Sequence, residues 1–339
     1  MTTYKDAGVD IATKEKAIES IKEYSKSTFT EVSASSSTMF KFGGGIDISK
    51  LEEKDPMIIL STDGVGTKMM VAEMMNKWDT VGLDIVHHSV NDILTSGARP
   101  LFFLDYIASA KLDSVILVEI VKGISKACKA LSIVMAGGET AEMPGVYEKG
   151  RYELVGTIGG VVDRGNIIDS SKIKEGDALI GLASNGLHTN GYSLARKILF
   201  EDNSHKPDDK LEELGETVGE ALLKPHREYA SIVLPLIKKR IVKGIAHITG
   251  GGFPSNIPRV IPKGLGVEIK EGWPVPPIFT LLQNLGKVPE DDMKKTFNMG
   301  IGMVLIVTKE DAKKAIEELK EGTIIGKVVK GEGVNYVGS

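Results

Sequence analysis

The sequence predicts two domains, each combining a β-sheet with helices, in the α/β to α+β class. The chain has 339 residues, whereas a single domain usually has about 100–200. Apolar segments of strand length alternate with amphipathic segments of helix length in both halves. Polar residues with Gly165 and Gly176 interrupt this alternation between 163 and 176. We therefore expect an N-terminal mixed-sheet domain over 1–165 and a C-terminal α+β domain over 175–339.

The clearest element of the N-terminal half is a helix over 114–131. Its apolar residues recur with helical spacing, and Asp113 stands in the N-cap position. The lone cysteine, Cys128, lies on this apolar stripe and is expected in the core. The other elements expected in this half are a helix over 13–27, a strand over 57–60, a helix over 83–94, and strands over 101–109, 133–136 and 152–162. The segment 28–49 has loop composition, rich in serine and glycine, and is expected to be mobile.

The C-terminal half repeats the alternation of strands and helices, without an internal sequence repeat. The expected elements are a strand over 178–183, a helix over 192–200, strands over 245–248 and 302–308, a helix over 309–320 and a strand over 323–329. A polar stretch over 201–210 separates the first helix from the elements that follow.

Composition excludes several classes of partner. Lys and Arg number 42 against 46 Asp and Glu, for a net charge of −4, so no nucleic acid is expected as a partner. No apolar run approaches the roughly 18–20 residues that span a bilayer, so no membrane is expected. The first residues lack the apolar segment of a signal peptide, and one cysteine cannot form an internal disulfide. These features predict a cytoplasmic protein.

Glycine is the outlier in composition. It supplies 38 of the 339 residues, in clusters rather than in a repeat. Such clusters suit a backbone that approaches a ligand closely. However, the segment 64–68 lacks the spacing of a P-loop, and no strand-linked Gly-x-Gly-x-x-Gly occurs. If the chain binds a nucleotide, it does so through a motif other than these two.

Three carboxylates stand beside glycines or in short polar breaks: Asp63, Asp92 and Glu139. Carboxylates from separate loops are the ligands that Mg²⁺ takes, with phosphate oxygens completing its shell. The alternative is that each is a turn or cap residue, as Asp often is. Taken together, the three indicate a metal–phosphate site.

Two polar loops are candidates for anion binding. His188 and Asn190 lie in the segment 184–191, between an apolar strand and a helix, where donors can face an anion. The alternative is a turn in which Asn190 caps the helix. His247 precedes Gly250, Gly251 and Gly252, which suit a phosphate nest or a plain turn. The pair His87-His88 has no third ligand in view and is not expected to bind a metal.

Taken together, several motifs resemble those of the phosphoribosylformylglycinamidine cyclo-ligases, the AIR synthetases of purine biosynthesis. The most specific are YKDAGVD at 4–10 and GGETAEMPG at 137–145. The others are TDGVGTK at 62–68, VND at 90–92, PLFFLDY at 100–106, NGYSL at 190–194, HITGGG at 247–252 and TFN at 296–298. Leu187 and Thr189 depart from the Pro and Ser that the family usually has, and 42–47 matches its glycine-rich loop only loosely.

The resemblance implies a ligase that uses ATP to close formylglycinamidine ribonucleotide to aminoimidazole ribonucleotide. In that reaction the formyl amide oxygen takes the γ-phosphate as an iminophosphate, a nitrogen attacks the activated carbon, and ADP and phosphate are released. Such chemistry depends on positioning and charge neutralisation. The family also implies a homodimer whose N-terminal domains build a joint β-barrel. In this setting the segment 28–49 is expected to close over ATP.

The resemblance also assigns roles to residues. Asp63, Asp92 and Glu139 are expected to hold Mg²⁺, and K⁺ is a possible second cation. His188, Asn190 and Lys22 are expected at the reacting groups. The ATP-binding set comprises Lys68, Gly64, Gly66, Gly137, Gly138 and Thr140. The substrate-binding set comprises Gly250, Gly251, Gly252 and Asn185.

Related activities are the alternatives. Formylglycinamidine ribonucleotide synthetase and thiamine-monophosphate kinase share the shorter motifs, although the former is normally much longer. A nucleotide-binding regulator without catalysis would be expected to lose carboxylates of the metal set, and all three are present.

Overall fold

A computed structural model describes residues 11–33 and 44–338, with side chains of the first helix described from residue 19. The chain divides into two compact units. The N-terminal unit comprises Met1–Ile93 and Ala98–Gly165, and the C-terminal unit comprises Leu94–Gly97 and Asn166–Ser339. Each unit combines one mixed sheet with helices, so the fold is α+β.

The N-terminal unit is built on a four-stranded sheet in the order β1-β4-β2-β3. The strands are β1 (Pro56–Gly64), β2 (Arg99–Ser109), β3 (Val134–Glu142) and β4 (Tyr152–Asp163). β4 pairs antiparallel with β1 and with β2, whereas β2 and β3 are parallel. The sheet order places β1 and β3 at opposite edges, so predicted site residues on these two strands lie apart within one chain.

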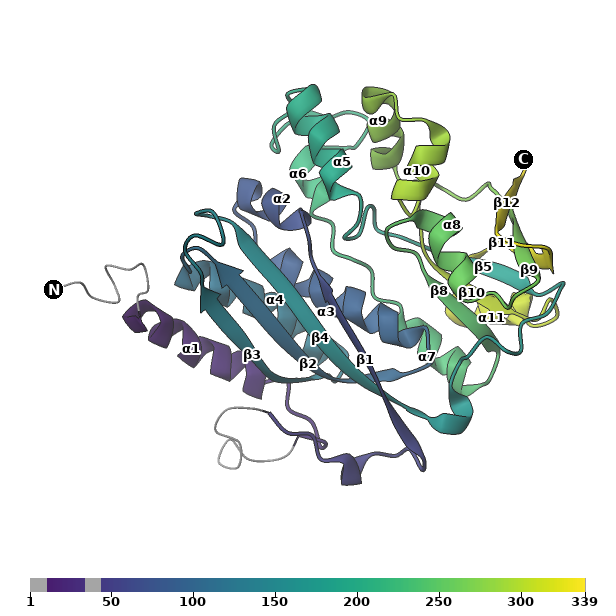
Figure 1. Ribbon diagram of the computed structural model, residues 1–339, viewed down its shortest axis with the longest axis horizontal. Coiled ribbons are helices and arrows are strands. Elements are labelled where there is room, and N and C mark those ends of the chain that lie inside the picture. The colour runs from purple at the N-terminus through teal and green to yellow at the C-terminus, as the bar shows by residue number, and fades with distance from the viewer. Residues whose placement is uncertain (1–10, 34–43, 339) are drawn as a thin grey trace. The chain divides into compact units, whose positions relative to one another are not determined.

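Helices cover one face of this sheet. They are α1 (Ile11–Lys26), α2 (Lys68–Met75), α3 (Asp79–Leu94) and α4 (Ser114–Ala130), and α3 and α4 lie behind the strands in Figure 1. Asp113 caps α4 by accepting from the backbone N–H of Val115, as predicted. A Cβ at Gly82 of α3 would lie 2.2 Å from the carbonyl oxygen of Ile120, so glycine permits the close approach of α3 to α4.

The opposite face of the sheet is less covered. Ile58 and Leu60 of β1 are 42% and 64% exposed, and they alternate with the half-buried Met57, Ile59 and Ser61 of that strand. The sheets formed by the described residues are open, and they close into no barrel. Apolar side chains on an open sheet face are a usual site of association.

Two strands of the N-terminal unit continue four or more residues past their predicted ends. β1 continues through Asp63 and Gly64, because both pair with β4, so Asp63 lies in a strand and not in a turn. β3 continues through Gly137, Gly138 and Glu139, because these residues pair with β2. In each case cross-strand hydrogen bonds outweigh the low strand propensity of Gly and Asp.

The C-terminal unit is built on a six-stranded sheet in the order β12-β9-β11-β5-β10-β8. Its strands are β5 (Ala178–Ala183), β8 (Val242–His247), β9 (Leu265–Lys270), β10 (Ile301–Val307), β11 (Thr323–Lys330) and β12 (Val334–Val337). All neighbours are antiparallel except β12 and β9. β6 (Lys210–Leu211) and β7 (Glu216–Thr217) form a separate two-stranded sheet.

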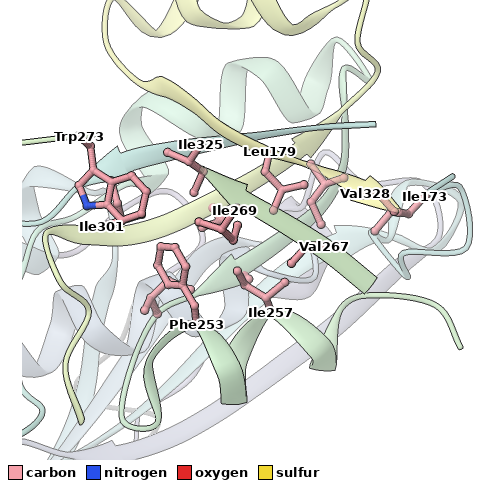
Figure 2. Close-up of a cluster of buried hydrophobic side chains, with 14 residues drawn as sticks. Ile173, Leu179, Phe253, Ile257, Val267, Ile269, Trp273, Ile301, Ile325 and Val328 are labelled. Carbon is pink, nitrogen blue, oxygen red and sulfur yellow. The ribbon is translucent and has the colours of Figure 1, made fainter. Parts of the chain in front are cut away.

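Short helices surround this second sheet. They are α5 (Tyr192–Arg196), α6 (Val218–Leu222), α7 (Ala230–Lys238), α8 (Gly252–Asn256), α9 (Pro277–Gly286), α10 (Glu290–Thr296) and α11 (Ala312–Leu319). The helix predicted over 192–200 is α5 followed by a π-helical turn over Lys197–Asp202. Figure 2 shows Phe253 and Ile257, from α8 and the turn after it, against Val267 and Ile269 of β9 in a buried apolar core.

The segment predicted to close over a nucleotide is described only at its two ends. Thr28 is buried and accepts from the backbone N–H of Met135, 2.9 Å away, and the N–H of Asp47 donates to the carbonyl of Val32. Residues 34–43 lie outside the described residues, so the expected closure stays a prediction. No helix among the described residues is long and apolar enough to cross a membrane.

Candidate functional site

In the N-terminal unit, two of the predicted carboxylates lie around one buried histidine. Asp63 is near the end of β1, and His88 and Asp92 lie one turn apart on α3. The Nε2 atom of His88 is 2.8 Å from a carboxylate oxygen of Asp63 and 3.8 Å from one of Asp92. Asp92 also accepts from the hydroxyl of Ser61 at 3.0 Å. Asp92 therefore lies in the helix predicted over 83–94, where Ser61 and His88 are its partners.

The electrostatics of this cluster favour the charged form of the Asp63 carboxylate. Burial alone would raise the pKa of Asp63, but the hydrogen bond and charge of His88 hold that pKa below its ordinary value. Burial alone would lower the pKa of His88, but its hydrogen bond to Asp63 and the charges of Asp92 and Asp63 raise it. The histidine thus lies between two carboxylates whose side chains are 44% and 27% exposed.

Glu139, the third predicted metal ligand, lies elsewhere in the unit. Asp63, Gly156, Asp105 and Gly138 form one row across the four strands, and Glu139 is the next residue of β3. Three strand spacings of about 4.8 Å place the edge strands about 14 Å apart. Within one chain, Glu139 thus lies at the opposite edge of the sheet from Asp63, and its role as a third Mg²⁺ ligand stays a prediction.

The predicted ATP-binding residues are divided in the same way. Gly64, Gly66 and Lys68 lie at the end of β1 and the start of α2, whereas Gly137, Gly138 and Thr140 lie in β3. The Lys68 ammonium is fully buried and forms an ion pair with Asp84 at 2.8 Å. A phosphate contact by Lys68 stays a prediction, and the structure gives this ammonium a carboxylate partner. Lys22 is exposed on α1.

In the C-terminal unit, the loop after β5 carries His188 in a left-handed conformation, with φ +63°. The His188 side chain is buried, and its Nε2 accepts from the backbone N–H groups of Asn185 and Arg227 at 3.2 and 3.4 Å. Because Nε2 accepts both hydrogen bonds, it carries no proton, and the proton of the neutral imidazole lies on Nδ1. The loop therefore fixes both the orientation and the tautomer of His188.

The glycine-rich segment after β8 lies against the same loop. A Cβ at Gly250 would be 3.1 Å from the side-chain oxygen of Asn190, so these two predicted site residues are in contact. The Asn256 amide braces the segment by donating to the carbonyls of Gly250 and Gly252. Gly251 and Gly252 have φ +92° and +57°, a region that other residues rarely adopt. The structure thus brings His188, Asn190 and the glycine segment together.

Two further histidines extend this cluster. His226 precedes α7, and its ring stacks on that of His188 with centroids 4.0 Å apart. Its Nε2 lies 3.1 Å from Nε2 of His247, the last residue of β8. All three rings are more than nine-tenths buried. The sequence indicated His247 only through the glycines after it, and it offered no signal for His226.

The sequence matches two family models in succession. Residues 46–162 match the N-terminal domain of AIR synthase related proteins, and residues 174–338 match the C-terminal domain. A phosphoribosylformylglycinamidine cyclo-ligase of Thermoanaerobacter pseudethanolicus is 48% identical over 97% of this chain and 98% of its own length. One of Bacillus cytotoxicus is 48% identical over 99% of this chain and 97% of its own. The chain belongs to the phosphoribosylformylglycinamidine cyclo-ligase family.

Solved structures of more distant proteins have the same fold as this cyclo-ligase family member. Thiamine-monophosphate kinase from Stenotrophomonas maltophilia matches with a TM-score of 0.67 over 94% of this chain and 95% of its own, at 15% identity. The E. coli hydrogenase maturation protein HypE matches with a TM-score of 0.62 over 95% and 94%, at 19% identity. At these identities the likeness concerns the arrangement of elements alone.

Sequence patterns do not predict two histidines of these clusters in this cyclo-ligase family member, His88 and His226. Local spacing shows no ligand partner for His88, yet Asp63 reaches it from β1. The signal that could have found it is the spacing of four residues between His88 and Asp92, which places both on one face of a helix. His226 and the orientation of His247 depend on contacts between distant segments, and local spacing carries no sign of them.

Proposed function

We propose that this protein uses ATP to close formylglycinamidine ribonucleotide to aminoimidazole ribonucleotide, with release of ADP and phosphate. The observation that carries this proposal is the 48% identity to a phosphoribosylformylglycinamidine cyclo-ligase over 97% of this chain and 98% of the relative. The protein is accordingly a ligase of purine biosynthesis. The formyl amide oxygen takes up the γ-phosphate, and the ring nitrogen then displaces phosphate from the activated carbon.

The N-terminal unit offers a fitting site for Mg²⁺ on ATP. Asp63 and Asp92 supply partly exposed carboxylate oxygens, the donors that Mg²⁺ prefers, and His88 holds the pKa of Asp63 low. When bound, the ion would neutralise charge on the transferred phosphate. Ser61 orients Asp92 by donating to it. Glu139 of β3 does not belong to this set within one chain.

The C-terminal unit is the proposed site for the substrate. Gly250, Gly251 and Gly252 present backbone that Asn256 holds in place, and Asn190 and Asn185 add amide groups. His188 is held in one tautomer by backbone donors. In this proposal the glycine segment receives the ribose phosphate, and His188 with Asn190 orients the reacting amide.

We also propose that the protein is a homodimer that pairs through the N-terminal sheet. Ile58 and Leu60 are exposed on β1, on the face of the sheet opposite to His88 and α3. Covering this apolar face stabilises a dimer by removing it from water. The family's joint β-barrel is one way in which two such open sheets can pair.

Direct assay tests the proposed function. Purified protein is incubated with ATP, Mg²⁺ and formylglycinamidine ribonucleotide, and aminoimidazole ribonucleotide and ADP are measured. Equal formation of both products is expected, and omission of Mg²⁺ should abolish it; K⁺ is tested as an added salt. Parallel reactions use thiamine monophosphate, or formylglycinamide ribonucleotide with ammonia. Turnover of either, without cyclisation, would assign a sister activity, and ATP binding without any turnover would indicate a regulator.

A further inference from the structure

His226 connects two segments of the C-terminal cluster that lie far apart in the chain. Its Nδ1 lies 3.3 Å from the hydroxyl of Thr189, in the loop after β5. Its Nε2 lies 3.1 Å from Nε2 of His247, at the end of β8. The two segments also meet where Asn190 contacts Gly250. The loop after β5 and the segment after β8 are thus joined twice, once by the contact of Asn190 with Gly250 and once by the ring of His226.

The contacts of His226 couple its protonation to that of His247. In a hydrogen bond between two Nε2 atoms, one nitrogen donates and the other accepts. In the first arrangement, Nε2 of His226 carries the proton and donates to His247; Nδ1 of His226 then accepts from the Thr189 hydroxyl, and the ring proton of His247 lies on its Nδ1. In the second arrangement, Nε2 of His247 carries the proton and donates to His226; Nδ1 of His226 then donates to Thr189, and Nδ1 of His247 carries no proton. The contact therefore couples the tautomer of His247 to that of His226.

The same residue also holds His188. The rings of His188 and His226 stack with an interplanar angle of 26°. The backbone N–H of the next residue, Arg227, donates to Nε2 of His188. His188 and Tyr229 also pack over Gly302, where a Cβ would lie 2.5 Å from Cε1 of His188. The segment 226–227 thus contacts His188 through a stacked ring and through a backbone hydrogen bond.

We propose that His226 is a positioning residue of the C-terminal site, which sets the tautomer of His247 and holds the loop of His188 and Asn190 against the glycine segment. It acts through these neighbours and need not touch the substrate itself. The kinetic consequence rests on the proposed function, whereas the tautomer of His247 does not. The two parts can therefore be tested separately.

Two substitutions separate the two nitrogens of His226. In His226→Gln the side-chain amide reaches the position of Nε2 and can keep the contact with His247. In His226→Asn it reaches only the position of Nδ1 and can keep the contact with Thr189. We expect kcat/KM of His226→Gln within about threefold of the wild-type value and that of His226→Asn at least about tenfold lower. His205→Asn is the matched control, because His205 lies outside the cluster and faces Asp209 at 3.6 Å.

Nitrogen-15 NMR of the histidine rings measures the tautomer of His247, which would not change if His226 had only a structural role. We expect His247 in one tautomer in the wild type and in His226→Gln, and a mixture of tautomers in His226→Asn. Thermal unfolding of both variants checks that they fold to a similar stability. An unchanged His247 tautomer and unchanged kcat/KM in His226→Asn would overturn the proposal, and so would equal losses in the two variants. If the wild type does not cyclise the substrate, the proposed function fails. The positioning role of His226 is then tested only by the NMR measurement of the His247 tautomer.

Discussion

Nε2 of His88 lies 2.8 Å from a carboxylate oxygen of Asp63, although the two residues come from a helix and from the edge strand β1. The pairing lowers the pKa of Asp63 and raises that of His88. It also places Asp92, four residues after His88, in the same charge cluster. This relationship shows which of the predicted carboxylates lie together.

Asp92→Asn tests the metal role of this cluster. The substitution keeps the shape and the acceptor for Ser61 but removes the charge that would oppose Mg²⁺. We expect turnover to fall about 100-fold or more, with thermal stability without ligand unchanged or raised. Asp79→Asn, an exposed position on the same helix, should retain turnover. Near-normal turnover of Asp92→Asn would reject the metal role, and a large loss of stability would indicate a structural ion pair.

Lys68→Met tests whether the buried pair of Lys68 and Asp84 is structural. Both side chains have no exposed surface, so removal of the ammonium leaves the charge of Asp84 in the interior. We expect the free energy of unfolding to fall by about 3–5 kcal/mol, measured by urea denaturation. The double variant Lys68→Met/Asp84→Leu should recover most of this loss.

The control for that prediction is the exposed ion pair of Lys197 and Asp202, 2.7 Å apart. Lys197→Met should leave the unfolding midpoint almost unchanged, because water already solvates both groups. A loss in Lys68→Met no larger than in Lys197→Met would contradict the structural role and favour a contact with the nucleotide.

Asp105 predicts a pH dependence of stability. It is buried in β2, its Oδ1 has no hydrogen-bond partner among the described residues, and burial raises its pKa from 3.8 to about 7. The folded state therefore keeps a proton that the unfolded state loses, and stability falls as pH rises from about 4 through 7. We expect Asp105→Asn to remove this fall, which amounts to about 4 kcal/mol between pH 4 and pH 8.

Urea denaturation across this pH range measures the difference between the wild type and Asp105→Asn. The advantage of the variant should grow with pH and level off above about pH 8. Asp208→Asn, at an exposed position, should give a difference from wild type that does not change with pH. A pH-independent difference for Asp105→Asn as well would rule out titration of this carboxyl.

Leu60→Glu tests association through the N-terminal sheet. Leu60 is 64% exposed on β1, and a charge there would have to be buried in the proposed dimer. Light scattering at micromolar concentration should give about twice 36.5 kDa for the wild type and a single chain for the variant. Val115→Glu is the matched control, because Val115 is similarly exposed, at 65%, but belongs to α4. A monomeric wild type would refute the proposal.

Much of this protein follows from local sequence. The helix capped by Asp113 and the strand over Ala178–Ala183 are where periodicity predicts them, because each buries a continuous apolar stripe or run. The motifs at 62–68 and 137–145 indicated the cyclo-ligase family, and the comparisons confirm it. The polar loop of His188 and Asn190 and the glycines after His247 could be recognised from composition and do lie together.

The tertiary structure alone decided which of these residues meet. Asp63 and Glu139 look equivalent in the sequence, each beside glycines after an apolar run, yet the order of the strands separates them and brings His88 to Asp63 instead. His226 had no sequence signal, although it contacts both Thr189 and His247. The physical reason is that periodicity reports which face of an element is buried, whereas the partner across that face is fixed by strand pairing and packing between segments far apart in the chain.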